Sequence, residues 1–173
     1  MDLSYPIGNF DWTQTVTPEQ RAKFIGDIAA APATFRQAAH GLDDIQLDTP
    51  YRPGGWTVRQ LIHHVADSHM NSYIRFRLAL TEDQPAAKGY DEKEWAKLHD
   101  CTSLPIGVSL QLLEGLHLRW VDILQAMTDA DFERSFRHSE KGLIRLDINL
   151  ALYSWHSRHH AAHITGLRER MGW

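Results

Sequence analysis

Apolar residues recur at steps of three and four in four separate segments of the chain, which predicts four long amphipathic helices. The first begins after Thr17, where a capping threonine, a proline and a glutamine three residues later satisfy the free amides of a helix start. It is expected to kink or divide at Pro32, because proline removes a backbone donor, and to stop at Gly41. The second helix has the same capping pattern at Thr57 and is expected to reach about Glu82.

Two further helices are predicted in the second half of the chain. The third runs from about Val108 to Met127, and the fourth runs from Asp147, taken as its N-cap, to about Met171. Four such helices, separated by one medium and two longer connections, predict an all-α fold. We expect a four-helix bundle with crossover connections that forms a single domain over residues 1–173.

The segments between these helices are rich in glycine and proline. Residues 42–56 are predicted to form a loop without a regular element. Residues 85–107 are expected to form a long excursion with one or two helical turns near 91–95, and a connection of this length in a compact domain is often functional. A small hairpin is expected around residues 139–142, before the last helix. The first 16 residues are interpreted as an arm.

Composition and charge narrow the class of protein. The 173 residues are 43% hydrophobic and 23% charged, which is typical of a soluble globular chain, and no apolar run is long enough to cross a membrane. The net charge of −4 disfavours nucleic acid as a partner. The first residues lack the basic and apolar regions of a signal peptide, so we expect a cytoplasmic protein. The single Cys101 cannot build a thiolate zinc site and is interpreted as a bystander thiol.

Histidine is the unusual feature of the composition. The chain has 11 histidines, and seven of them fall within two short windows that lie far apart in the sequence. Those seven are His63, His64, His69, His156, His159, His160 and His163.

The spacing within these windows predicts a metal site. His156 and His160 are four residues apart, so both emerge from one face of a helix, and His64 is the best candidate for a third ligand from a facing helix. Three imidazoles with an open fourth position are typical of a catalytic site, although they do not select one metal. His159 and His163 form a rival pair with the same spacing, and periodicity alone does not decide between the two pairs.

Two segments carry a family resemblance. Gly55–Tyr73 (GWTVRQLIHHVADSHMNSY) and Tyr153–Ile164 (YSWHSRHHAAHI) closely resemble the YfiT-type metal-dependent hydrolases of the DinB-like superfamily. The likeness covers almost the whole chain and is weakest at residues 99–108. It implies a four-helix bundle with one divalent metal ion per chain, zinc or nickel, and a homodimer. The ligands that the resemblance implies are His64, His156 and His160.

The leading hypothesis is a metal-dependent hydrolase in which the three-histidine site activates water or a small thiol towards a small-molecule substrate. Some relatives, the resemblance implies, transfer low-molecular-weight thiols such as bacillithiol to electrophiles. The first alternative is therefore a bacillithiol-type thiol S-transferase, with the thiol as co-substrate. The second alternative is a non-catalytic metal-binding module of a stress response, because a shared fold does not establish shared chemistry.

Other residues receive more general interpretations. The sequence names no general base, but Asp67 is a candidate to orient a ligand imidazole or to accept a proton. Arg75 and Arg158 are candidates to bind the carboxylates of a thiol cofactor. Trp56 and Trp155 flank the ligand segments and are expected to shape the wall of the pocket. His63 is expected to point away from the site, and the histidines outside the two pairs and His64, including His69 and His117, are interpreted as structural or surface residues.

Overall fold

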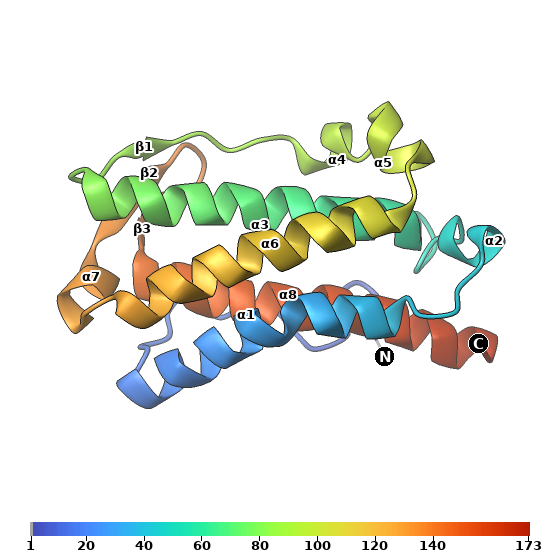
Figure 1. Ribbon diagram of the computed structural model, residues 1–173, viewed down its shortest axis with the longest axis horizontal. Coiled ribbons are helices and arrows are strands. Elements are labelled where there is room, and N and C mark those ends of the chain that lie inside the picture. The colour runs from blue at the N-terminus through green and yellow to red at the C-terminus, as the bar shows by residue number, and fades with distance from the viewer. Residues whose placement is uncertain (1) are drawn as a thin grey trace.

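The computed structural model describes residues 2–173 and contains four long helices (Figure 1). They are α1 (Pro18–Ala38), α3 (Val58–Thr81), α6 (Ile106–Ala126) and α8 (Leu146–Met171). The predicted four-helix bundle is thus confirmed. Over residues 2–173, no helix combines the length and the hydropathy that a membrane span requires.

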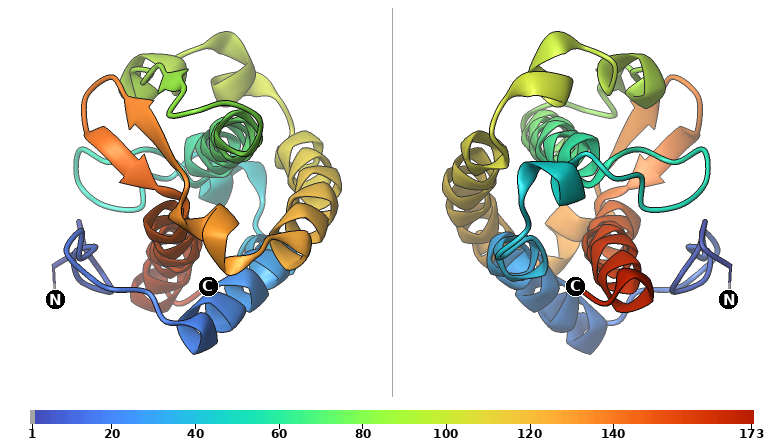
Figure 2. Two further views of the ribbon diagram at one scale, coloured as in Figure 1. Left: turned by 90° about the vertical axis from the view of Figure 1, so that its left-hand side faces the viewer. Right: turned by 90° about the vertical axis from the view of Figure 1, so that its right-hand side faces the viewer.

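The order of the helices around the bundle explains the long excursion before α6. α1 packs against α8 and α6, and α3 packs against the same two helices, so α1 and α3 lie diagonally opposite (Figure 2). α3 and α6 run in the same direction, so the chain must return along the bundle between them (Figure 1). This return segment, residues 82–105, contains β1 (Ala86–Ala87), α4 (Glu92–Trp95) and α5 (His99–Ser103).

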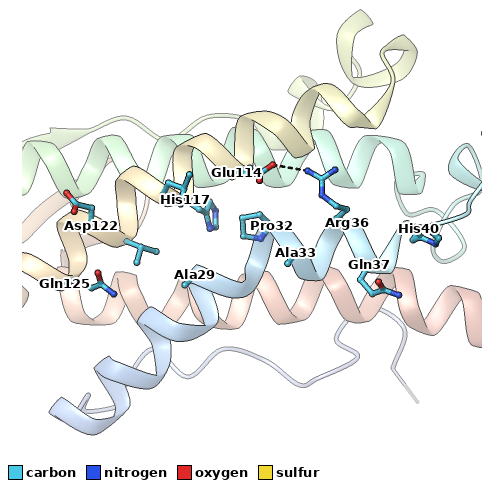
Figure 3. Close-up of a pocket in the computed structure, with 12 residues that line it drawn as sticks. Ala29, Pro32, Ala33, Arg36, Gln37, His40, Glu114, His117, Asp122 and Gln125 are labelled. Carbon is cyan, nitrogen blue, oxygen red and sulfur yellow. Dashed lines mark hydrogen bonds and ion pairs between the residues drawn. The ribbon is translucent and has the colours of Figure 1, made fainter.

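The first helix begins where the sequence predicts. The amide of Gln20 donates to the hydroxyl of Thr17 at 3.3 Å, and the side chain of Gln20 accepts from the Thr17 amide at 2.8 Å. α1 is not divided at Pro32, but it changes direction there (Figure 3). The helix ends at Ala38, three residues before the predicted stop at Gly41, and Gly41 adopts a φ of 78° beyond it.

Two local predictions were wrong in detail, and one short helix was not predicted. The segment 42–56 contains the short helix α2 (Asp44–Leu47), which is capped by the carboxylate of Asp43. A further short helix, α7 (Asp129–Glu133), follows α6. The N-cap of α8 is Arg145 rather than Asp147. Asp147 lies in the first turn instead, where its negative carboxylate interacts favourably with the positive end of the helix dipole. The carboxylate also accepts a hydrogen bond from the guanidinium of Arg145 at 2.7 Å.

The predicted hairpin is present and belongs to a three-stranded sheet. β2 (Ser135–His138) and β3 (Gly142–Arg145) pair antiparallel. β1 pairs parallel with β2 and aligns Ala86 with Arg137, a contact that links the start of the return segment to the hairpin. The chain turns into β3 at Gly142, whose φ of 74° favours glycine.

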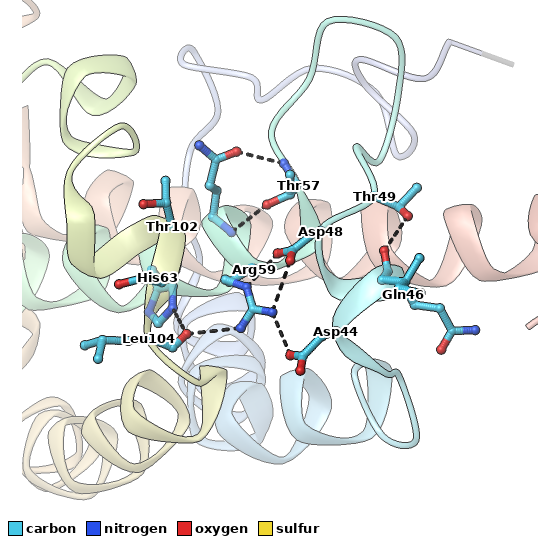
Figure 4. A network of polar contacts seen from close by, with 12 residues as sticks. Asp44, Gln46, Asp48, Thr49, Thr57, Arg59, His63, Thr102 and Leu104 are labelled. Carbon is cyan, nitrogen blue, oxygen red and sulfur yellow. Dashed lines mark hydrogen bonds and ion pairs between the residues drawn. The ribbon is translucent and has the colours of Figure 1, made fainter.

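A buried arginine holds one end of the bundle together (Figure 4). Arg59, in the first turn of α3, donates to Asp48 at 2.6 Å and to Asp44 at 2.8 Å. It also donates to the carbonyl of Leu104 at 3.2 Å, just before α6. His63 donates to the same carbonyl from Nε2 at 3.2 Å, and its Nδ1 accepts from Ser109 at 2.7 Å. Both nitrogens of His63 are therefore engaged, and the ring points away from His64 as predicted.

Candidate metal centre

A cavity of about 570 Å³ lies between α3 and α8. Its walls come from six parts of the chain: the N-terminal arm, the loop before α3, α3 itself, the return segment, the hairpin and α8. The polar and aromatic residues that line it include Tyr5, Trp56, His64, Ser68, Arg75, Tyr90, His138, Tyr153, Trp155, His156, His159 and His160.

Three of the lining histidines form a compact group, which we call the His64 cluster. His64, His156 and His160 each offer one ring nitrogen, and these nitrogens lie within 4.8 Å of one another. The ring centroids are 5.5 Å apart for His64 and His156, and 4.4 Å apart for His156 and His160. His64 comes from α3 and the other two from consecutive turns of α8, the arrangement that the spacing predicts.

Burial keeps these imidazoles neutral. Desolvation lowers the pKa of His64 to about 4. The pKa values of His156 and His160 also lie well below the ordinary value of 6.5, because of desolvation and then because neighbouring imidazoles disfavour a positive charge. Among residues 2–173, Nδ1 of His160 is buried without a hydrogen-bond partner, as is Nδ1 of His159. Neutral ring nitrogens with free lone pairs are the donor set that zinc and nickel accept, so the residues present fit a divalent metal ion.

A second histidine group shares one member with the first. One nitrogen each of His159, His160 and His163 also lies within 4.8 Å of the others. Two of these rings are already engaged, because Nε2 of His159 and Nε2 of His163 are hydrogen bonded at 3.1 Å. The His163 ring stacks on Tyr51 at 4.1 Å and lines a separate cavity of about 150 Å³. The contacts therefore favour the His64 cluster over the rival pair as the open site.

Aromatic side chains form much of the cavity wall. The Trp56 ring lies 4.6 Å from His64, and the Trp155 ring stacks on His159 at 4.3 Å. Both tryptophans line the cavity, as the sequence predicts. The hydroxyl of Tyr153 donates to the carbonyl of Ser68 at 3.0 Å, which fixes a polar group beside the His64 cluster. The cavity thus combines an apolar wall with a few directed polar groups, as small-molecule sites do.

Comparison with known proteins assigns the family. A family model for the DinB superfamily matches residues 27–164. The chain belongs to the DinB superfamily. A relative from Bacillus mycoides (strain KBAB4) is 54% identical over 172 residues, which cover 99% of each chain. YfiT from Bacillus subtilis (strain 168) is 52% identical over 174 residues, which cover 100% of this chain and 98% of YfiT. Both are named "Putative metal-dependent hydrolase".

A solved structure extends the comparison to the fold. The structure of Bacillus subtilis YfiT superposes with a TM-score of 0.96 at 52% identity, and it covers 100% of this chain and 99% of that one. That structure is described as having an unusual four-helix bundle topology. This DinB-superfamily chain shares the overall fold of that structure; in it, α3 and α6 run in the same direction and the return segment joins them (Figure 1).

Of the two arginines singled out in the sequence, this DinB-superfamily fold places one in the cavity. Arg75 is 8% exposed, and its guanidinium lies 6.0 Å from the Phe136 ring. In the described part of the chain it forms no ion pair with a carboxylate. Arg158 is half exposed, lies outside the cavity lining and pairs with Asp27 at 3.5 Å. Arg75 is therefore the arginine available to a bound molecule.

Asp67 and Cys101 lie outside the cavity lining. Burial, and then the nearby carboxylate of Asp100, raises the pKa of Asp67 to about 6. No hydrogen bond among residues 2–173 joins the Asp67 carboxylate to His64. Burial also raises the pKa of the Cys101 thiol to about 11. The thiol of this superfamily member is therefore protonated at neutral pH, consistent with a bystander.

Sequence reasoning missed the connection of two buried histidines to the site. His69 and His117 are completely or almost completely buried, and they link His156 to α1 through hydrogen bonds. The available signal was their position on the apolar stripes of two helices, because a buried imidazole requires hydrogen-bond partners. In this DinB-superfamily chain those partners include a residue of the His64 cluster.

Proposed function

We propose that the protein is a metal-dependent hydrolase whose divalent metal ion is held by His64, His156 and His160. The observation that carries this proposal is the group of three neutral imidazoles with nitrogens within 4.8 Å, in the wall of a cavity large enough for a small molecule. A divalent ion on three neutral ligands keeps its full charge, which lowers the pKa of a water or thiol that it binds. We propose zinc or nickel, at one ion per chain.

The surrounding side chains orient the substrate and exclude bulk water. The hydroxyl of Ser68 lies 3.5 Å from Nε2 of His156 and 3.2 Å from the hydroxyl of Tyr153. Both hydroxyls can therefore hydrogen bond a polar group next to the His64 cluster. Trp56 and Trp155 cover the apolar sides of the cavity, and a drier site strengthens every electrostatic contact within it.

Arg75 indicates the class of substrate. A buried guanidinium without a carboxylate partner is costly unless a ligand neutralises it, so we propose that the substrate or co-substrate carries a carboxylate or another anionic group. Arg75 lies eleven residues after His64 on α3, which corresponds to about 16 Å along the helix axis. Helical side chains lean towards the N-terminus, so the head group lies closer to His64 than its Cα does. The ligand would extend from the His64 cluster towards this end of the cavity.

The same observation favours a second candidate function. A low-molecular-weight thiol that carries carboxylates, of the bacillithiol type, would place its thiol at the His64 cluster and its anionic end near Arg75. The reaction would then be S-transfer to an electrophile, because the thiolate is the nucleophilic form. Cys101 does not supply this nucleophile, since it is buried and lies outside the cavity lining.

The metal content of the purified protein tests the ligand assignment. We expect about one ion per chain by elemental analysis, and loss of that ion in His64→Ala, His156→Ala and His160→Ala. His163→Ala is the matched control, because it removes a buried histidine of the rival pair from the same helix and should keep the ion. Circular dichroism verifies folding in each variant. Metal lost in His163→Ala and kept in His64→Ala would move the site to the rival pair.

Turnover separates the candidate functions. The metal-loaded protein is incubated with ester, amide and electrophile panels, each with and without a carboxylate-bearing thiol. Activity without thiol supports the hydrolase, and activity only with thiol supports the transferase. Arg75→Met should raise KM for anionic substrates and leave KM for neutral analogues unchanged. A folded, metal-loaded protein that turns over nothing, and that unfolds when the metal is removed, would support a non-catalytic metal-binding module.

A further inference from the structure

A chain of hydrogen bonds runs through the protein interior from α1 to the His64 cluster. Nδ1 of His117 lies 2.7 Å from the carbonyl oxygen of Ile28. Nε2 of His117 lies 2.8 Å from Nδ1 of His69. Nε2 of His69 lies 3.2 Å from Nδ1 of His156. This series of hydrogen bonds therefore joins three imidazoles, from α6, α3 and α8, to one backbone carbonyl of α1.

The carbonyl sets the direction of every bond in this chain. An oxygen of this kind only accepts, so His117 must carry its proton on Nδ1. Nε2 of the neutral His117 ring then accepts, and His69 must donate to it from its own Nδ1. Nε2 of His69 accepts in turn, so His156 donates from Nδ1. Nε2 of His156 is thereby left without a proton, so its lone pair can accept from the Ser68 hydroxyl, 3.5 Å away, or bind a metal ion.

Pro32 explains why the Ile28 carbonyl is available. In an uninterrupted helix this carbonyl would accept from the amide four residues later, which is position 32. Proline has no amide hydrogen, so the Ile28 oxygen cannot form this usual helical bond. Figure 3 shows the His117 side chain directed from α6 towards this stretch of α1, beside Pro32. The feature that bends α1 also supplies the acceptor at the start of the chain.

The hydrogen bonds in this series all point the same way only if the two inner imidazoles, His69 and His117, are neutral. His69 is 0% exposed and His117 is 2% exposed. Neither forms an ion pair with a carboxylate anywhere in residues 2–173. A buried charge without a counter-ion is strongly unfavourable, so both rings stay neutral and each donates one bond and accepts one.

We propose that His69 and His117 are positioning residues that hold the proton of His156 on Nδ1 and present its Nε2 lone pair to a metal ion. This inference rests on the proposed metal centre, in which His156 is a ligand. The fold thus selects the tautomer of His156 before any ion arrives, and it also restrains the orientation of the ring. Hydrogen bonds to the second nitrogen of a ligand histidine commonly tune metal affinity in this way.

Nitrogen NMR of the metal-free protein tests the direction of the chain without any metal or activity. Long-range ¹⁵N–¹H correlation spectra at pH 7.5 distinguish an imidazole protonated on Nδ1 from one protonated on Nε2. We expect the Nδ1–H form for His117, His69 and His156. An Nε2–H form for His156 would overturn the inference, whether or not the protein binds metal. Failure of the proposed metal centre is seen separately, as an absence of zinc binding with the expected tautomers in place.

The zinc affinities of two His69 variants test whether this positioning of His156 strengthens metal binding. His69→Phe removes the acceptor for His156 and should weaken zinc binding by about 10–100-fold in a chelator competition assay. His69→Gln keeps one donor and one acceptor and should bind within a few-fold of wild type. His63→Phe is the matched control, because it removes a buried histidine of α3 whose bonds lead to Ser109 and Leu104, and it should leave the affinity unchanged.

Two results of this series would overturn the inference. One is wild-type zinc affinity in a folded His69→Phe protein. The other is an equal loss in His69→Phe and His69→Gln, which would assign the effect to packing rather than to hydrogen-bond direction. If His69→Phe does not fold, the tautomers of the wild-type protein still decide the question.

Discussion

The indole nitrogen of Trp155 donates a hydrogen bond to the carbonyl of Gly8 at 3.1 Å. This bond attaches the N-terminal arm to the helix that carries two residues of the His64 cluster. The arm is held further by ring contacts, because Tyr5 lies 5.9 Å from His159 and Phe10 lies 6.0 Å from Trp155. The arm is therefore part of the cavity wall rather than a loose extension.

Trp155→Phe should loosen the arm. The variant loses the bond to Gly8, which is worth about 1 kcal/mol, and part of the contact with Phe10. We expect faster chymotrypsin cleavage within the first 16 residues and little change in the unfolding of the bundle. Trp95→Phe, at a tryptophan of α4 outside the arm, is the control. Equal cleavage rates for Trp155→Phe and wild type would show that other contacts hold the arm.

Asp67→Asn should stabilise the protein at neutral pH. The folded pKa of Asp67 is about 6, above the ordinary value of 3.8, so the native state holds a proton that the unfolded chain loses between those values. Stability therefore falls as pH rises through this window. Asparagine removes that penalty, and we expect a gain of about 1 kcal/mol at pH 7.5 in urea unfolding. Metal content should not change, and its loss would instead support a role for Asp67 in orienting a ligand.

The buried histidines should make the metal-free protein sensitive to acid. Desolvation lowers the folded pKa of His117 to about 4 and that of His163 to about 3, below the ordinary value of 6.5. Between these values the unfolded state binds more protons than the native state, so stability is lost as pH falls below about 6.5. Urea unfolding with EDTA at several pH values between 5 and 7.5 measures the slope.

Substitution of one such histidine should reduce this slope. His163→Phe removes one group that takes up a proton on unfolding, so the free energy of unfolding should depend on pH less steeply by up to about 1.4 kcal/mol per pH unit. The exposed His99 of α5 provides the control, and His99→Gln should keep the wild-type slope. An unchanged slope in His163→Phe would contradict the assignment of this acid sensitivity to buried imidazoles.

Cys101 should react slowly in the native protein. Its side chain is buried, and its thiol pKa is raised to about 11, so little thiolate forms at pH 8. We expect slow labelling by a disulfide reagent in the native protein and fast labelling in guanidinium. Cys101→Ala should leave metal content and turnover unchanged. Rapid native labelling would require the segment around α5 to open.

The parts of the fold that depend on local chemistry could be predicted from the sequence. The capping boxes at Thr17 and Thr57 involve residues three positions apart, so their sequence signature is complete in itself. β1 could not be predicted, because two alanines form a strand only when they pair with β2, about fifty residues later. The N-cap of α8 was misplaced because Asp147 also suits the first turn, where the structure places it.

In the candidate site, too, the features that depend on local spacing could be predicted, and those that depend on contacts between distant residues could not. Helical spacing predicts the pair His156 and His160, with His64 as the third candidate, but it allows the pair His159 and His163 equally well. The family resemblance decides between the two pairs. The bond between His69 and His117 joins residues 48 positions apart on two helices, so no spacing rule identifies it. Arg75 likewise stands out as a candidate to bind an anionic group only because its guanidinium is buried in the cavity. That burial depends on the hairpin that packs against it.

The parallel course of α3 and α6 has a consequence for how this architecture can diversify. A tight turn cannot join two helices that run in the same direction, so the topology requires a return segment as long as the bundle. In this protein that segment contributes Tyr90 and Glu92 to the cavity, while the His64 cluster lies wholly on α3 and α8. Its length and composition can therefore change which molecules enter the cavity without disturbing the helices that carry the histidines.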